Sequence, residues 1–186
     1  MSTKKKISLQ FIIIIAMAAA LNIVGSNLAL LLKLPVYLDT IGTILAAALL
    51  GPLAGCFAGG VTSIIMGLTS DLISLYYLPV QLVIGLGAGL LYHKWRPDKW
   101  KSLWLVALLI SLPGTVVSTA ITYFLFHGIT SSGSSIIVQL LLGLGLNKAF
   151  AVFMVQLITD YFDRLIGVSV VAVLYRILKA KIVKPL

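Results

Sequence analysis

The segment from Ile7 to Leu32, ISLQFIIIIAMAAALNIVGSNLALLL, is an apolar run of about 25 residues. A helix needs ~20 apolar residues to cross the hydrocarbon core of a bilayer, so this run is long enough for one membrane span. Lys4, Lys5 and Lys6 precede it, as charged residues precede the core of a signal peptide. That core, however, has only roughly 7–15 apolar residues. We therefore expect a retained first transmembrane helix.

The composition of the whole chain has the same character. Of the 186 residues, 60% are hydrophobic and 10% are charged, whereas soluble domains have about 25% charged residues. The mean hydropathy is +1.12. So little polar surface excludes a soluble enzyme, a secreted disulfide scaffold and a disordered chain. Cys56 is the single cysteine, which excludes a disulfide framework and a cysteine-based metal site.

Further apolar segments follow the first, and they predict an all-α integral membrane protein with a bundle of six transmembrane helices in a single domain, 1–186. The segments are 7–32, 39–50, 53–69, 78–92, 103–126 and a long last helix from about residue 147, preceded by an outer piece at 134–145. The second and fourth segments are short for a full crossing, so they need tilting or breaks lined by protein. Short, interrupted helices often border a binding cavity.

The charge pattern gives the orientation. The net charge is +9, and there are 14 Lys and Arg residues against 5 Asp and no Glu. In a soluble domain this excess would suggest nucleic acid, but in a membrane protein it is typical of cytoplasmic loops, so we expect no nucleic-acid partner. With six spans and cytoplasmic N- and C-termini, eleven basic residues face the cytoplasm: Lys4, Lys5, Lys6, Lys94, Arg96, Lys99, Lys101, Arg176, Lys179, Lys181 and Lys184. Two spans in the last region would place the basic tail outside. Trp95, Trp100 and Trp104 flank the inner loop, as interfacial aromatic residues do.

Small residues recur at helical spacing. They are Gly51, Gly55, Gly59, Ser63 and Gly67 in the third segment, and Gly85 and Gly89 in the fourth. Such stripes allow helices to approach closely in lipid. They indicate either packing inside the bundle or a sliding contact with another membrane subunit.

The first segment has two different faces. Ala16 and Ala20 lie one turn apart on the same face. Asn22 lies about 200° around the helix from Ala20. One face can therefore dock a partner while the polar point faces the bundle interior, although packing within the bundle also explains the alanines.

Polar residues at the outer ends of the segments are candidates for ligand binding. Asp39, Thr40 and Thr43 open the second segment, where Asp39 is also a good helix N-cap. Asp71, Tyr76, Tyr77 and Gln81 combine a carboxylate, two rings and an amide, which suits a flat heterocyclic ligand as well as an interfacial aromatic belt.

The last segment carries a polar stripe. Gln156, Asp160 and Arg164 are spaced by four residues, with Asp163 beside them. Asp160 precedes Arg164 in the favourable order for an ion pair, which would hold the bundle together. Gln156 and Asn147, nearer the outside, are then better ligand candidates than Arg164.

Catalytic and metal motifs are missing from the sequence. His93 and His127 fall on opposite sides of the predicted membrane, and there is no Gly-rich phosphate loop or hydrolytic triad motif. We expect no catalytic residue, no metal site and no cofactor in this chain.

Taken together, these features resemble the substrate-binding (S) component of energy-coupling factor (ECF) vitamin transporters. The motifs that carry the resemblance are the alanine pair Ala16–Ala20, the run Leu38-Asp39-Thr40-Ile41-Gly42-Thr43, the run Leu50-Gly51-Pro52-Leu53-Ala54-Gly55, and Asp160-Tyr161-Phe162-Asp163-Arg164-Leu165-Ile166. The ordered set is similar to the riboflavin-type branch, with Arg164 where that branch has Lys. It covers essentially the whole chain.

The resemblance implies a bacterial cell-membrane protein that binds a B-type vitamin or its precursor on the outer face. It implies docking through Ala16, Ala20, Gly55 and Gly59 onto a transmembrane scaffold (T) subunit, which two cytoplasmic ATPase subunits drive with ATP and Mg²⁺. Toppling of the S component would deliver the ligand inward. We favour a pyridoxine- or hydroxymethylpyrimidine-like ligand over riboflavin or cobalamin. The competing hypotheses are a stand-alone, ion-coupled secondary transporter of a small solute and a membrane scaffold that does not transport.

Overall fold

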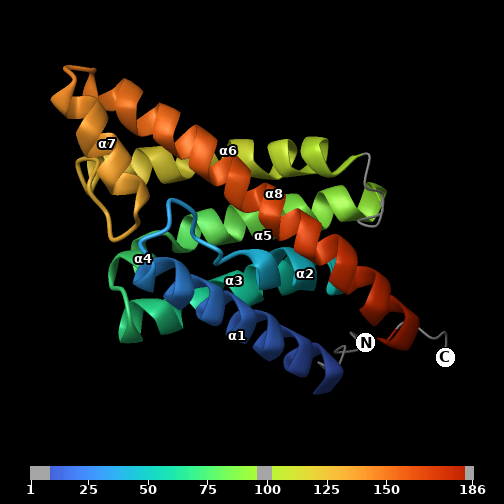
Figure 1. Ribbon diagram of the computed structural model, residues 1–186. Coiled ribbons are helices and arrows are strands. Elements are labelled where there is room, and N and C mark those ends of the chain that lie inside the picture. Colours follow the sequence, from blue (N-terminus) through green and yellow to red (C-terminus); the bar gives the residue numbers. More distant parts are fainter. Residues whose placement is uncertain (1–8, 96–101, 183–186) are drawn as a thin grey trace, which may run out of the picture.

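The computed structural model describes residues 9–95 and 102–182, with side chains described as far as residue 177. Several residues named in the orientation argument lie outside this part: Lys4, Lys5, Lys6, Arg96, Lys99, Trp100, Lys101, Lys184 and the side chains of Lys179 and Lys181. Over the described residues the chain is a helical bundle (Figure 1). Its helices are α1 (Leu9–Leu31), α2 (Ile41–Leu50), α3 (Pro52–Thr69), α4 (Ile73–Tyr76), α5 (Leu78–Lys94), α6 (Leu103–Phe124), α7 (Ser134–Gly143) and α8 (Lys148–Ile182).

Helix boundaries follow the local chemistry of the chain. Pro52 begins α3, where a missing N–H costs nothing. Gly51 before it has φ 96°, a conformation that glycine adopts without strain, and it makes the sharp turn from α2 into α3. The segments predicted from the sequence therefore match helices, and the outer piece at 134–145 corresponds to α7.

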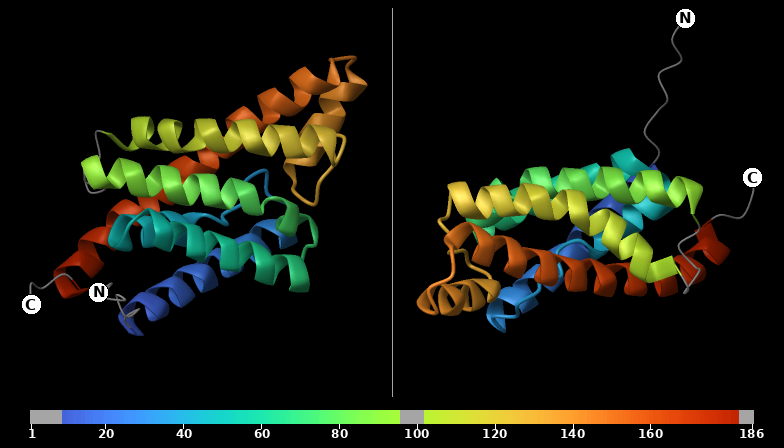
Figure 2. Two further views of the ribbon diagram at one scale, coloured as in Figure 1. Left: turned by 180° about the vertical axis from the view of Figure 1, so that it is seen from behind. Right: turned by 90° about the horizontal axis from the view of Figure 1, so that it is seen from above.

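The helices pack around α2, which contacts α1, α3, α5 and α8. α3 packs along α5, and α6 packs along α8. α8 crosses the bundle obliquely, from α7 at one end to the opposite end, where α1 begins (Figures 1 and 2). The link after α1, α4 and α7 gather at the other end, which we call the α4–α7 end (Figure 1).

Glycines set the closest helix contacts. A Cβ added to Gly85 on α5 would lie 2.6 Å from the backbone nitrogen of Cys56 on α3. A Cβ on Gly55 would lie 2.7 Å from the Ala47 Cβ, and one on Gly59 would lie 3.0 Å from the Gln81 Cβ. Both α3 glycines are buried inside the bundle. The predicted docking role of Gly55 and Gly59 is therefore corrected: they pack against α2 and α5, and the bundle itself covers them.

The surface and the interior have the polarity expected of a protein in lipid. Large apolar side chains such as Leu53, Phe57 and Val116 are exposed, while Asn22, Gln81 and Asp160 are buried. The apolar part of the core joins α2, α5, α6 and α8. With no water in a bilayer core, polar side chains gain by meeting each other inside the bundle.

Three of the described helices, α1, α3 and α6, are long and apolar enough to cross a membrane. α2 has 10 residues and reaches only about 15 Å, half the thickness of a hydrocarbon core of ~30 Å. It therefore cannot cross alone. α8 is one continuous helix of 35 residues, as the single long last helix predicts. The number of six spans and the cytoplasmic termini stay predictions.

Candidate functional site

A pocket opens at the α4–α7 end of the bundle. Its empty space is about 770 Å³ when the open solvent at its mouth is included. Side chains from α1, α3, α5, α6 and α8 line it, and the link 32–40, α4 and the link 125–133 contribute to its rim. Helices that are far apart in sequence thus build one site.

Asp39 lies in the link before α2 and faces this pocket. Gln81 Nε2 donates to the Asp39 carbonyl oxygen at 3.0 Å and to Asp39 Oδ2 at 2.9 Å. Burial raises the pKa of the Asp39 carboxyl to about 6, and the nearby Asp163 adds to the shift, while Arg164 and Gln81 oppose it. The sequence suggested that Asp39 caps α2. In the structure Thr40 is the N-cap residue instead, and its side chain makes no cap hydrogen bond.

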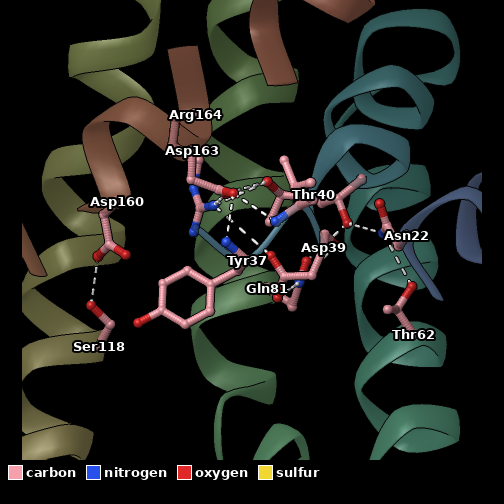
Figure 3. A network of polar contacts seen from close by, with 12 residues as sticks. Asn22, Tyr37, Asp39, Thr40, Thr62, Gln81, Ser118, Asp160, Asp163 and Arg164 are labelled. Atoms are coloured by element: carbon pink, nitrogen blue, oxygen red, sulfur yellow. Dashed lines mark hydrogen bonds and ion pairs between the residues drawn. The ribbon is translucent and has the colours of Figure 1, made fainter. Parts of the chain in front are cut away.

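Asp163 fastens the link to α8. Its Oδ1 accepts hydrogen bonds from the backbone N–H groups of Tyr37 at 2.9 Å and Leu38 at 2.6 Å. Leu38 has a φ of 53°, a backbone conformation that residues other than glycine rarely adopt. The Asp163 carboxylate therefore holds the link in a strained conformation. Asp163 Oδ2 accepts from Arg164 and from Thr40. The clamp fixes Asp39 next to Arg164 (Figure 3).

Arg164 reaches toward the link rather than along its own helix. Its Nη1 donates to Asp163 and, at 3.0 Å, to Thr40 Oγ1, and it lies 3.9 Å from Asp39 Oδ1. The ion pair expected between Asp160 and Arg164 is not among the ion pairs of the described residues. Asp160 Oδ2 instead accepts hydrogen bonds from Ser118 at 2.7 Å and Thr115 at 3.0 Å on α6. Asp160 and Arg164 both line the pocket. The sequence had favoured Gln156 and Asn147 over Arg164 as ligand candidates.

Asn22 connects α1 to the floor of the site. Its Oδ1 accepts from the Gly42 backbone N–H at 2.6 Å, which satisfies a free donor at the start of α2. Its Nδ2 donates to Thr43 Oγ1 at 2.9 Å and to Thr62 Oγ1 at 3.1 Å. Thr43 then donates to Gln81 Oε1 at 2.9 Å. A continuous chain of hydrogen bonds therefore joins α1 to Asp39 (Figure 3).

Two tyrosines supply the aromatic walls. Tyr37 donates to Gln156 Oε1 at 3.0 Å, and Gln156 Nε2 donates to Thr122 Oγ1 at 2.6 Å. The Tyr77 hydroxyl also bonds to Thr122. Both rings line the pocket and are held by polar partners behind them. Gln156 positions these tyrosines and does not line the pocket.

The remaining predicted residues divide between the rim and the exterior. Asp71 lines the pocket and accepts from Ser74 at 3.0 Å and Ser131 at 2.8 Å, joining two rim segments. Tyr76 is half exposed and packs edge-on against Phe126. Asn147 is exposed and accepts from the Ala149 backbone N–H at 2.9 Å, so it caps α8.

The structure thus brings five predicted residues to the pocket, and these are Asp39, Asp71, Tyr77, Gln81 and Asp160. Asn22, Thr40, Thr43 and Gln156 support them from behind. The sequence reasoning missed Tyr37, Ser118 and Arg164, which also line the pocket. Tyr37 had a signal, because it stands two residues before Asp39 in the same polar break. Ser118 had none, because a serine in an apolar helix usually bonds to its own backbone.

The opposite face of α1 carries the alanine pair. Ala16 and Ala20 are exposed, while Asn22 is completely buried. The predicted two-faced helix is confirmed. Ile13, Met17 and Val24 are exposed beside the alanines. This face is apolar, and its small alanine side chains allow another membrane helix to pack closely against it.

Comparison with known proteins gives one result for nearly the whole chain. The family model described as ECF transporter, substrate-specific component, matches residues 10–180. No curated protein matches the chain. No solved structure matches it either.

Proposed function

The chain belongs to the family of ECF transporter substrate-specific components, and on that premise we propose that it captures a B-type vitamin or precursor at the α4–α7 end. A pyridoxine- or hydroxymethylpyrimidine-like heterocycle is favoured over the larger riboflavin and cobalamin. The observation that carries this proposal is the pocket itself, where two tyrosine rings stand beside Asp39, Gln81 and Arg164. Rings with a few fixed polar groups suit a flat, polar ligand.

Delivery of the ligand would depend on partner proteins. We propose that the exposed face around Ala16 and Ala20 docks on an ECF transmembrane scaffold subunit in a bacterial cell membrane. Two cytoplasmic ATPase subunits would supply the energy by hydrolysing ATP with Mg²⁺, so this chain would itself be no enzyme. The separation of the pocket from the α1 face supports this division of labour, because a partner can cover that face without blocking the pocket.

A thermal-shift screen of the purified full-length protein against B vitamins and their precursors tests the binding step. A ligand at 100 times its Kd stabilises the folded state by about 2.7 kcal/mol, so a tight ligand raises the Tm clearly. We expect one small heterocycle to do so, and we expect Gln81→Leu to abolish its effect, because Gln81 orients Asp39. No stabilisation by any vitamin would contradict the proposal.

Reconstitution in liposomes tests the energy source. We expect accumulation of the ligand only when the scaffold and both ATPases are present together with ATP. Accumulation by this chain alone, driven by an ion gradient, would instead establish the stand-alone secondary transporter.

A further inference from the structure

The charged side chains at the pocket do not balance. Asp39, Asp71 and Asp160 line the pocket and Asp163 lies behind its wall, so four carboxylates stand against the one guanidinium of Arg164, which gives a formal charge of −3. Arg164 bonds directly to Asp163, while its distance to Asp39 Oδ1 is 3.9 Å. Among the described residues, no other Lys or Arg lines the pocket. Asp39 and Asp160 therefore lack full compensation within this part of the chain.

The same side chains leave polar atoms without partners. Asp39 Oδ1 and Arg164 Nε are buried and make no hydrogen bond. Both hydrogen bonds to Asp160 go to Oδ2, so Oδ1 receives none from the described residues. The Arg164 and Asp160 side chains are almost fully buried, at 3% and 2% exposure, and both line the pocket. Buried polar groups without partners are costly, so Asp39 Oδ1 and Arg164 Nε mark places for groups of a ligand. Asp160 Oδ1 is a further acceptor at the pocket wall.

One aromatic ring stands between two of these carboxylates. In Figure 3 the Tyr37 side chain lies between Asp160 on one side and Asp39 on the other. Tyr77 lines the same pocket. An aromatic face attracts a cation and repels an anion, because its quadrupole is negative at the face. Carboxylates and rings therefore favour the same sign of charge in the ligand.

We propose that the pocket selects organic bases: aromatic heterocycles whose ring nitrogen or amino group is neutral or protonated, in preference to carboxylated or phosphorylated vitamins. This inference rests on the proposed function and names its substrate class. N–H groups of the base would donate to Asp39 Oδ1 and Asp160 Oδ1, while a hydroxyl of the ligand would accept from Arg164 Nε–H. Asp160 then acts as a specificity-determining residue on the wall opposite Asp39.

Matched probes that differ in charge test the selection. The full-length protein in detergent at pH 7.5 is titrated with pyridoxamine, pyridoxine and 4-pyridoxic acid, which share one ring. A second set is 4-amino-5-hydroxymethyl-2-methylpyrimidine with its phosphate ester, and a third is riboflavin with its 5′-phosphate. Biotin and pantothenate are added as two further anionic probes. We expect the tightest probe to be a basic or neutral compound that binds at least tenfold more tightly than its anionic partner.

The outcomes separate the two levels of the proposal. If an anionic compound binds most tightly, selection of bases is overturned, while capture of a vitamin stands. If no compound of any charge binds, both are overturned.

Two substitutions then test the assigned residues with the tightest basic probe. Asp160→Asn and Asp39→Asn should each weaken its binding at least tenfold, while the Tm of the unliganded protein stays unchanged or rises as repulsion is removed. Ser111→Ala is the control, because Ser111 is buried on the same helix as Ser118 but bonds to the Leu108 carbonyl oxygen. Unchanged affinity in both Asn variants, or loss of binding in Ser111→Ala as well, would overturn the assignment.

Discussion

At the scale of single residues, two neighbours on α8 have different tasks. Asp163 holds the backbone of the link before α2, whereas Arg164 presents part of its guanidinium to the pocket. The two side chains form a hydrogen bond and an ion pair inside the bundle. Buried charges persist only when they are paired and hydrogen-bonded, so the pocket-lining Arg164 depends on Asp163.

Asp163→Ala should therefore be strongly destabilising. It removes the acceptor of two backbone N–H groups and leaves the Arg164 charge without its closest partner, which costs roughly 3–5 kcal/mol for a buried pair. Thermal unfolding in detergent measures the change. Asp163→Asn is the matched variant, and it should lose less because its side-chain oxygen can still accept from Tyr37 and Leu38. Equal losses in both variants would contradict the clamp.

Asn22→Ala should lower the free energy of unfolding by about 1–3 kcal/mol, because the Gly42 N–H and two threonine hydroxyls lose their buried partner. Asn27→Ala on the same helix is the control, since Asn27 is exposed and its amide donates only to the Ile23 carbonyl of its own helix and to the weakly accepting Met66 sulfur. Chemical unfolding of both variants compares them. A loss at Asn27 as large as that at Asn22 would argue against the link between α1 and α2.

At the scale of elements, the spacing of small residues decides how closely helices approach. On α5, Gly85 meets the backbone of α3, while Gly87, two residues later, has nothing within 4 Å of an added Cβ. Two glycines of one helix thus have opposite environments. The four-residue spacing of Gly85 and Gly89 in the sequence indicates glycines in close helix contacts, because residues one turn apart share a face.

Gly85→Ala should destabilise the bundle by about 1–3 kcal/mol through overpacking against Gly55 and Cys56. Gly87→Ala should be neutral or stabilise it by up to about 1 kcal/mol, because alanine is the better helix former. The Tm of the two variants in the same detergent gives the comparison. A Gly85→Ala variant as stable as Gly87→Ala would show that α3 and α5 do not pack as closely as described.

At the scale of the whole molecule, the bundle presents three regions with different tasks. The pocket opens at the α4–α7 end, the apolar face of α1 carries Ala16 and Ala20, and the remaining exterior exposes large apolar side chains to lipid. The hydrogen bonds from the buried Asn22 through Thr43 and Gln81 to Asp39 join helix α1 to the pocket.

Ala16→Trp and Ala20→Trp should abolish vitamin uptake in cells while the purified protein keeps its affinity for the ligand. A large ring on this face prevents close approach of the scaffold subunit but does not reach the pocket. Val116→Trp is the control, because Val116 is exposed on α6. Normal uptake by both alanine variants, or loss of uptake in Val116→Trp as well, would argue against docking through α1.

The sequence by itself determined the helices, the apolar exterior and the two faces of α1, because each depends on periodicity and composition within one segment. It also indicated Asp39, Tyr77 and Gln81 as site residues, since polar groups at the ends of apolar runs need a reason to be there. Only the tertiary structure decided that Gly55 and Gly59 are buried, that Arg164 pairs with Asp163 and Asp39, and that Ser118 reaches Asp160. These contacts join residues on different helices or a helix and a link, and the crossing of helices that creates them is set by packing between segments, which no single segment encodes.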